Sequence, residues 1–405
     1  MSHRRPAWAW ALGIALALIL WPWPGHAAEV PPLTPQVSIT FGETVTIVLP
    51  LNSLGPVRRV EIYLRPEGQI DTYTQDMILE ENQARYDHPV AKKPLPLFGR
   101  VYYWFKIYPA QGPVYRSPAF MFIYEDNRFA WQARTVEPVT VHWYQGDAAL
   151  AEEALNAAHI ALKNAFVQWQ GRLNPERGVR VYIYASAKDL YSALSTLPPD
   201  MRDDAIQWAQ HTVLVYGDPS PSSRTRLQHQ IAYQVAHIVL YDTAGNGFSL
   251  LPWWFREGLA ALAEPQPAPT ALKILYDAAA ANQLFPLRDL CFPPDFESPE
   301  DETLARAEAR AFVTYLFTRY GPAGLQRLLE MYTRGLGCEE GVRAALGVAL
   351  TDLEHNWRAA QELIPQPRVG LGWVGLWVAL GILAPSAVLG AWHWRTRHAL
   401  EEEGR

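Results

Sequence analysis

The sequence predicts an α+β fold class, with a β-rich part followed by a mainly helical part. Residues 33–130 alternate apolar and polar side chains at a period of two, which is typical of strands that bury one face. After residue 138, three short strand-like runs interleave with long segments whose apolar residues repeat at helical spacing. An uncharged segment near the C-terminus adds one predicted membrane helix.

Residues 1–27 have the pattern of a signal peptide for secretion. Arg4 and Arg5 precede an apolar run from Ala7 to Leu20, and small residues end the segment at Ala27. Prolines that follow the apolar run end its helix early, so we expect cleavage after Ala27. An uncleaved anchor helix is the alternative, and it would leave the following domains on the same side of the membrane.

Residues 33–130 predict an antiparallel β-sandwich as the N-terminal domain. We expect strands at Thr44–Leu51, Val60–Leu64, Arg100–Tyr108 and Phe120–Tyr124. β-branched and aromatic residues are enriched in these runs, and Gly, Pro and Asn lie between them. A sandwich of this length has the size of an immunoglobulin-like or fibronectin-like domain.

Residues 138–364 predict a second domain of α+β type. Its strands are expected at Val139–Tyr144, Val179–Tyr184 and Thr212–Tyr216, and a long helix is expected from Asp147 to Leu173. Further helices are expected at 188–195, 223–242, 252–264, 268–282, 302–319, 322–334 and 350–363. A small sheet followed by helices is a common architecture for an α+β domain.

Residues 369–394 predict a transmembrane helix, and residues 395–405 a cytoplasmic tail. No charged residue occurs from Val369 to Trp392, and a helix of that length spans roughly 36 Å, enough to cross about 30 Å of hydrocarbon. Arginines follow directly, and positive flanks stay in the cytoplasm. We therefore expect a single-pass protein of the cell membrane with its bulk extracytoplasmic; a buried core helix is the alternative.

Composition restricts the partners and suggests one covalent link. The net charge is −6 and no basic stripe occurs, so nucleic acid is not an expected partner. Cys291 and Cys338 are the two cysteines. Outside the cytoplasm they are expected to form one disulfide, with two buried thiols as the alternative.

Two consecutive predicted helices carry the residues of a metal-site pattern. The first contains His237, and the second contains Glu257 followed by Gly-Leu-Ala. This order suggests a zinc peptidase of the gluzincin type, in which His-Glu-x-x-His places two histidines one helical turn apart on the metal. The Glu between them is the general base for the zinc-bound water, and a Glu on the next helix is the third ligand.

The region resembles the bacterial exported proteins that carry a peptidase MA-like domain. The resemblance rests on segments in a fixed order: Asp126–Trp131, Val181–Ala185, Leu251–Ala260 and Gly347–Trp357, after a sheet that contains Val-Tyr-Tyr-Trp. It spans most of the expected exterior part. It implies that residues 138–364 form a gluzincin-like α+β peptidase domain.

This chain departs from the motif of that family at two of four positions. His237 matches the second His and Glu257 the downstream ligand, whereas Tyr233 stands at the first His position and Gln234 at the general-base position. A neutral amide cannot accept the proton, and loss of a positioned base typically costs about 10²–10⁴ in rate. A phenol binds a metal only after losing its proton. Zinc held by Tyr233, His237 and Glu257 is therefore possible, or zinc has been lost.

Other residues near the motif have weaker functional interpretations. His229 lies roughly 12 Å before His237 along a helix, which is too far to share one ion. Trp253, Trp254 and Phe255 are more consistent with a core than with a substrate-contacting cluster. Glu264 is a carboxylate that would have to move the proton if the site were active.

Three functions are compatible with these features. The first is a catalytically inactive pseudo-peptidase that binds a peptide or protein outside the cytoplasm. The second is an active zinc metallopeptidase with a non-standard Tyr/His/Glu site. The third is a surface adhesion or scaffold protein that binds through its β-sandwich.

Overall fold

The fold is described from a computed structural model that covers residues 32–202, 204–217, 220–264 and 269–363. The predicted signal peptide, transmembrane helix and cytoplasmic tail lie outside these residues. Within the residues that are described, no helix is both long enough and apolar enough to cross a membrane.

The chain divides into two compact units. The first contains the described residues up to Leu155 and the segment Pro175–Leu227; the second contains Asn156–Asn174 and the described residues from Gln228 onward. Consequently the helices α2 (Ala148–Trp169) and α5 (Pro221–Ala244) each contribute to both units.

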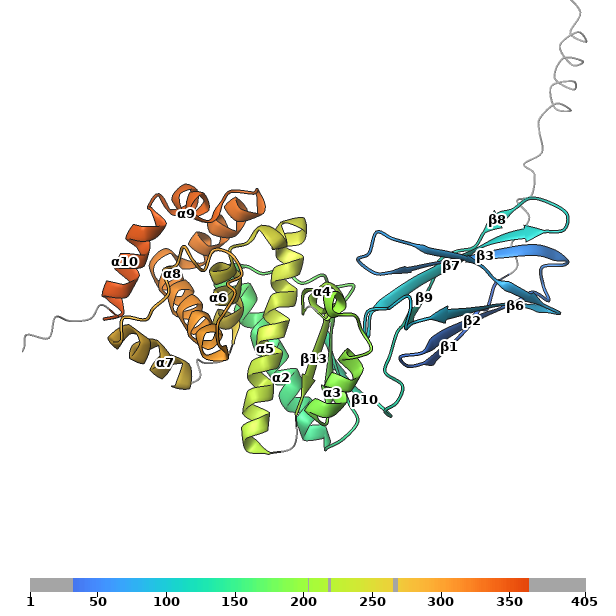
Figure 1. The fold of residues 1–405 in the computed structure, drawn as a ribbon, viewed down its shortest axis with the longest axis horizontal. Helices are drawn as coiled ribbons and strands as arrows, with labels where there is room; N and C mark the ends of the chain where they lie inside the picture. The colour runs from blue at the N-terminus through green and yellow to red at the C-terminus, as the bar shows by residue number, and fades with distance from the viewer. Residues whose placement is uncertain (1–31, 203, 218–219, 265–268, 364–405) are drawn as a thin grey trace, which may run out of the picture. The chain divides into compact units, whose positions relative to one another are not determined.

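Two antiparallel sheets form the N-terminal part of the first unit (Figure 1). Their strand orders are β1-β2-β6-β5 and β4-β3-β7-β8, with β9 also paired to β7. The strands are β1 (Gln36–Thr40), β2 (Thr44–Pro50), β3 (Val57–Pro66), β4 (Tyr73–Asp76), β5 (Ile78–Glu80), β6 (Gln83–Pro89), β7 (Arg100–Pro109), β8 (Tyr115–Arg116) and β9 (Phe120–Ile123). Side chains from both sheets, such as Ile47, Leu64 and Phe105, are fully buried in one core, as expected where inward residues alternate with polar ones.

A mixed four-stranded sheet with the order β10-β11-β12-β13 completes the first unit. β10 (Gln132–Val136) pairs antiparallel with β11 (Val139–Trp143), while β11, β12 (Val179–Tyr184) and β13 (Thr212–Tyr216) run parallel. Parallel neighbours require crossover connections, which α2, α3 (Ala187–Leu194), the short 3₁₀ turn η1 (Pro199–Met201) and α4 (Asp204–Ala209) provide. Every residue of β12 is buried, as expected for a strand covered on both faces.

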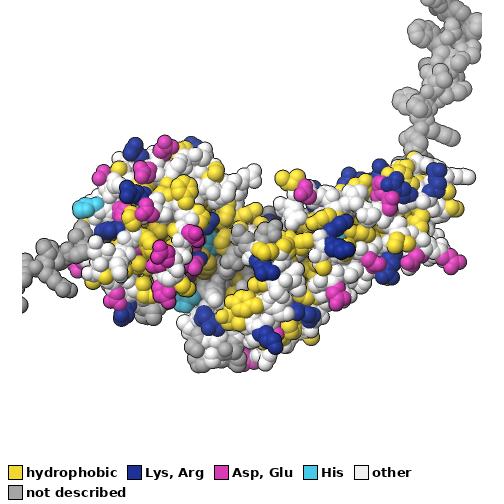
Figure 2. All heavy atoms as spheres, in the orientation of Figure 1, with side chains coloured by type: hydrophobic (Ala, Val, Ile, Leu, Met, Phe, Trp, Pro, Cys, Tyr) yellow, Lys and Arg dark blue, Asp and Glu magenta, His cyan; other side chains and the backbone are white. Residues whose placement is uncertain are grey.

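Helices make up the second unit. They are the rest of α5, the 3₁₀ turn η2 (Gly245–Leu250), α6 (Trp253–Ala263), α7 (Pro269–Ala280), α8 (Pro299–Thr333), α9 (Cys338–Leu346) and α10 (Leu350–Ala360). The break predicted between residues 319 and 322 is a kink inside α8, where Gly321 has a φ of 63°. A further short helix, α9, was not predicted. On the face shown in Figure 2, basic and acidic side chains are interspersed.

A glycine lets α6 approach α8 closely. A Cβ atom added to Gly258 would stand 2.3 Å from Val313 Cγ2 and 2.5 Å from the carbonyl oxygen of Ala309. Only a residue without a Cβ fits at this point without moving α8. The close approach brings the preceding residue, Glu257, to the surface of α8.

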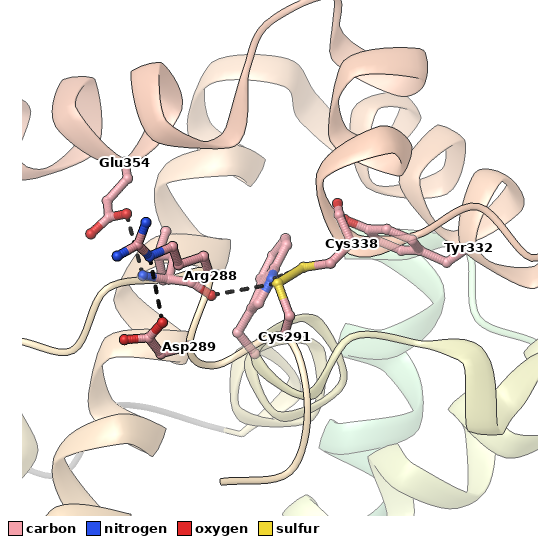
Figure 3. Close-up of a disulfide and its surroundings, with 8 residues drawn as sticks. Arg288, Asp289, Cys291, Tyr332, Cys338 and Glu354 are labelled. Atoms are coloured by element: carbon pink, nitrogen blue, oxygen red, sulfur yellow. Dashed lines mark hydrogen bonds and ion pairs between the residues drawn. A yellow bond between two sulfur atoms is a disulfide. The ribbon is translucent and has the colours of Figure 1, made fainter.

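The structure contains a disulfide between Cys291 and Cys338 (Figure 3). Trp254 donates its indole N–H to the Cys338 sulfur at 3.2 Å, and the hydroxyl of Tyr332 donates to the carbonyl oxygen of Cys338 at 3.1 Å. Trp254 and Phe255 have no exposed surface, so they are core residues. The disulfide therefore links the first residue of α9 to the segment between α7 and α8.

Candidate functional site

Three of the four motif positions come together between α5 and α6. Tyr233 and His237 lie one turn apart on α5, with ring centroids 4.5 Å apart. The hydroxyl of Tyr233 donates a hydrogen bond to Glu257 Oε2. The Nε2 atom of His237 lies 3.9 Å from the same carboxylate oxygen. The spacing on α5 and the close approach of α6 together explain why these groups meet.

A side chain of α8 completes the cluster. Arg306 Nη1 donates to Glu257 Oε2 at 2.6 Å and also to the hydroxyl of Tyr233. Its Nη2 atom donates to Glu302 Oε1, one turn earlier on α8, at 2.9 Å. The guanidinium carbon lies 5.1 Å from the centroid of the Tyr233 ring. A permanent positive charge therefore contacts both oxygen donors that a zinc ion would need.

The ion pair between Arg306 and Glu257 matters for stability because the Glu257 carboxylate is buried. The Glu257 side chain is 4% exposed and that of His237 is fully buried, whereas Arg306 is 40% exposed. An ionised carboxylate at such a depth requires a charged or hydrogen-bonding partner. Arg306 provides both, and Arg256 Nε adds a longer contact of 3.4 Å to Glu257 Oε1.

The protonation states follow from the same environment. Burial lowers the pKa of His237 to about 3, so its imidazole is neutral at neutral pH. Burial alone would raise the pKa of Glu257, but the charges of Arg306 and Arg256 and the hydrogen bond from the Tyr233 hydroxyl act against it, and that pKa lies below its ordinary value. Burial and the Glu257 charge raise the pKa of Tyr233 well above its ordinary value, so the phenol keeps its proton.

A pocket of about 200 Å³ opens beside the cluster. Its lining residues come from α5, α6 and α8 and are His229, Gln230, Tyr233, Glu257, Ala261, Glu264 and Arg306. His229 Nδ1 lies 3.2 Å from Glu264 Oε2, and Arg310 Nη1 lies 2.9 Å from the same oxygen. Glu264, the carboxylate considered for proton transfer, is therefore held by a histidine and an arginine at the edge of the pocket.

Gln234, at the general-base position, is half-buried on α5. Among the described residues it is not one of those that line the pocket. Its amide has no basic lone pair of use at neutral pH, so nothing in its placement restores the missing base.

The donor set does not fit a catalytic zinc ion. Such an ion takes three protein ligands from His, Glu, Asp or Cys, with a fourth position open to water. Here one imidazole, one carboxylate already bonded to Arg306 and one protonated phenol are available. In the part of the chain that the structure describes, no group of three or more such residues is placed to hold a metal.

Arg306 is not among the site residues predicted from the sequence. The predicted helix from 302 to 319 contains several arginines, and spacing along it does not show which one reaches Glu257. Chemistry offered a signal, because a buried ionised carboxylate needs a neighbouring cation or hydrogen-bond donor. Choosing the cation required the packing of α6 on α8.

Residues 164–362 match the family model of the peptidase MA superfamily. No curated protein sequence matches the chain. Among solved structures, BhCBM56 is 18% identical with a TM-score of 0.20, and the match covers 24% of this chain and 95% of that chain.

Two enzymes with solved structures show similarly low likeness. A polysaccharide deacetylase from Bacillus cereus is 10% identical with a TM-score of 0.21, over 42% of this chain and 57% of that chain. A family 76 glycoside hydrolase from a bovine Bacteroides thetaiotaomicron strain is 9% identical with a TM-score of 0.18, over 82% and 64%. The chain spans less than two thirds of either enzyme, and TM-scores this low support no conclusion about fold or function.

The family match contains α5, α6 and α8, the three helices that supply the cluster. Both retained motif residues, His237 and Glu257, lie within it. Residues 164–362 of this chain therefore form a domain of the peptidase MA superfamily.

Proposed function

We propose that this protein is a catalytically inactive member of the peptidase MA superfamily that binds a peptide or protein outside the cytoplasm. The observation that carries the proposal is the contact of Arg306 with both Glu257 and Tyr233. A zinc ion at this place would have to displace a guanidinium that already neutralises its carboxylate ligand. Gln234 removes the base as well, so both halves of the zinc–water chemistry are missing.

The pocket supports a binding role. Its volume of about 200 Å³ lies below the roughly 300–1,000 Å³ of sites for drug-sized ligands, so it suits one side chain or a short segment. The Oε1 atom of Gln230 is buried and has no hydrogen-bond partner among the described residues, although Gln230 lines the pocket. An N–H group of a bound peptide would satisfy this acceptor.

The proposed setting of this domain follows from the rest of the chain. Residues 1–27 direct export, residues 33–130 form an immunoglobulin-like domain, and residues 138–364 form the peptidase-like domain. Residues 369–394 hold the protein in the cell membrane with residues 395–405 in the cytoplasm. The sequence patterns support this organisation, which places the pocket outside the cytoplasm.

Zinc content of purified full-length variants tests the proposal. The wild type and the double variant Tyr233→His, Gln234→Glu should both contain little zinc after dialysis against a weak chelator, because Arg306 remains in place in each. Adding Arg306→Ala to the double variant removes the competing cation and restores the full ligand set. This triple variant should take up about one zinc ion per chain, measured by elemental analysis.

Other results would favour a different function. If the wild type already holds one zinc ion that is lost on His237→Ala, the chain is a metalloprotein and an active peptidase becomes the better hypothesis. If the triple variant also remains free of zinc, these helices do not form a decayed gluzincin site. Arg310→Ala in the double variant is the matched control, since Arg310 contacts Glu264 rather than Glu257.

A further inference from the structure

A buried arginine in the first unit has hydrogen-bond donors without partners. Arg180 lies on β12 and is 8% exposed. Its Nη2 atom donates to the carbonyl oxygen of Gln210 at 2.9 Å and to Thr212 Oγ1 at 3.3 Å. Its Nε and Nη1 atoms are buried and have no hydrogen-bond partner within the described residues. A guanidinium has five N–H groups, so three of them are unsatisfied here.

Two more arginines lie close enough for their charges to act on this group. Burial lowers the pKa of Arg180, and the charges of Arg100 and Arg177 act in the same direction, whereas Tyr182 and Glu67 oppose the shift. Arg177 Nη2 lies 3.0 Å from Glu67 Oε2, and Arg100 Nη1 lies 3.7 Å from the same oxygen. The Nε atom of Arg177 is also buried without a hydrogen-bond partner in the described structure.

The cluster has more positive than negative charge. Arg100 and Arg177 share the one carboxylate of Glu67, and Arg180 forms no ion pair with any described residue. Glu125 is near enough to influence Arg180, but burial raises the pKa of Glu125 and the Arg180 charge only opposes that effect. An arginine cannot shed its proton to relieve the cost of burial, so the missing partner must be an anion or water.

We propose that Arg180 is the centre of an anion-binding site, with Arg100 and Arg177 at its rim, that takes a small oxyanion such as phosphate or a carboxylate group. Net positive charge favours an anion over water, because Glu67 offsets only part of the charge of the three guanidiniums and water offsets none of it. The side chains of Arg100, Arg177 and Glu67 are 17–18% exposed, so the rim reaches solvent.

The location of the site gives it a structural consequence. Glu67 directly follows β3 and Arg100 begins β7, whereas Arg177 lies two residues before β12 and Arg180 lies on it. The Gln210 side chain already joins these parts, because it accepts from the Arg100 amide at 3.3 Å and donates to the Glu67 carbonyl oxygen. A bound anion would add a second link at the same junction, so anion binding should stabilise the first unit.

Thermal unfolding of the full-length protein in a non-ionic detergent, with sodium phosphate varied at constant ionic strength, tests this site. We expect Tm to change little below the dissociation constant of phosphate and to rise by roughly 3–5 °C for each tenfold increase above it. Arg180→Gln should abolish the phosphate dependence. Arg85→Gln should keep it, because Arg85 is an exposed residue that pairs with Asp87 on β6 of the same unit.

Further measurements with other anions identify the ligand, and a second variant keeps the test decisive if the first does not fold. Acetate and chloride in place of phosphate show whether the site takes a carboxylate or a halide. If Arg180→Gln does not fold, Arg100→Gln at the rim should raise by about tenfold the phosphate concentration at which Tm begins to rise. The proposal is overturned if no anion raises Tm at constant ionic strength, or if Arg180→Gln retains the wild-type shift. It is also overturned if Glu125→Gln destabilises the protein as much as Arg180→Gln does, since Glu125 would then be the partner of Arg180.

Discussion

At the scale of single residues, an arginine and a metal ion neutralise a carboxylate in different ways. Zinc accepts electron pairs, polarises a bound water and lowers the pKa of that water to about 7. The guanidinium of Arg306 donates hydrogen bonds to Glu257 and Tyr233 and has no open coordination position. It can therefore preserve the shape of the helix cluster without supplying a nucleophile.

Removing Arg306 should destabilise the fold. Arg306→Met leaves the buried Glu257 carboxylate without its main cation and should lower the free energy of unfolding by about 2–3 kcal/mol, somewhat less than for a fully buried pair because Arg306 is 40% exposed. Denaturant unfolding measures the change. Adding Glu257→Gln should recover part of the loss, and Arg334→Met, which breaks an exposed pair with Glu330, should cost less than about 1 kcal/mol. Equal losses for Arg306→Met and Arg334→Met would contradict a buried ion pair.

Glu308 predicts a dependence of stability on pH. It is fully buried on α8, accepts a hydrogen bond from the Phe285 amide at 3.0 Å, and burial raises its pKa to about 8. A carboxyl group whose pKa is higher in the folded state contributes its full stability below the unfolded value of 4.5. That contribution is lost as the pH rises through about 8.

The variant Glu308→Gln keeps a neutral group at this position at every pH. Compared with the wild type, it should lose less stability between pH 5 and pH 8.5, with each unit of pKa shift worth about 1.4 kcal/mol. Denaturant unfolding at the two pH values measures the difference. Parallel pH profiles for the variant and the wild type would show that Glu308 is ionised in the folded protein.

At the scale of helices and strands, a strand was predicted correctly where β-branched and aromatic side chains occupy its positions. The strands at Val179–Tyr184 and Thr212–Tyr216 were predicted with the bounds that the structure has, because β-branched and aromatic residues fill them. Strand β6 was not predicted. Its inward positions are Ala84, Tyr86 and His88. A histidine counts as polar in the sequence pattern, so the alternation is incomplete there. In the structure His88 is buried, and burial lowers its pKa to about 4.

The residues of the candidate site were also predicted only in part from the sequence. The one-turn spacing of Tyr233 and His237 is a local property of a helix, and the resemblance to the peptidase family indicated that Glu257 would meet them. The position of Arg306 depends on how α6 and α8 pack together, because Arg306 contacts Glu257, 49 residues earlier in the chain. No local pattern specifies such a contact.

The packing of α6 on α8 gives a test at this scale. Gly258→Ala should lower the free energy of unfolding by about 1–3 kcal/mol, because the new methyl group would overlap Val313 and the Ala309 carbonyl. The change should be measured by thermal or denaturant unfolding. Gly337→Ala is the matched control, since its nearest neighbour would be a Glu340 side-chain oxygen at 3.8 Å. If both variants unfold alike, α6 and α8 are not in close contact.

The disulfide gives a second test. It joins residues 47 positions apart, and closing a loop of that length stabilises the folded state by about 4 kcal/mol in the chain-entropy model. Reduction, or the double variant Cys291→Ala, Cys338→Ala, should lower the unfolding free energy by a comparable amount. A reductant should have no further effect on the double variant, and an unchanged midpoint in the wild type after reduction would contradict a stabilising link.

At the scale of the whole molecule, the helix α5 connects the two compact units. Its first turns belong to the first unit, and the turns that carry Tyr233 and His237 belong to the second. The family match begins inside α2, at residue 164, and continues through α5. A fragment cut at the boundary between the two units would therefore cut through α2 or α5.

The proposed anchoring can be tested on the whole chain. Deleting residues 369–405 should move the protein from the membrane fraction to the soluble extracytoplasmic fraction, because the uncharged segment from Val369 to Trp392 would be gone. Cell fractionation with immunodetection measures the distribution. A truncated chain that stays with the membrane would show that another part of the protein, such as an uncleaved signal segment, provides the attachment.

The pairing of Arg306 with Glu257 has a consequence for where such a protein can work. Zinc bound at a peptidase site must be acquired from the surroundings, and chelators or depletion of the metal can remove it. A cation that is part of the polypeptide is synthesised with the chain and cannot be withdrawn. The helix cluster should therefore keep its form in zinc-poor surroundings, where a zinc-dependent relative would lose its ion.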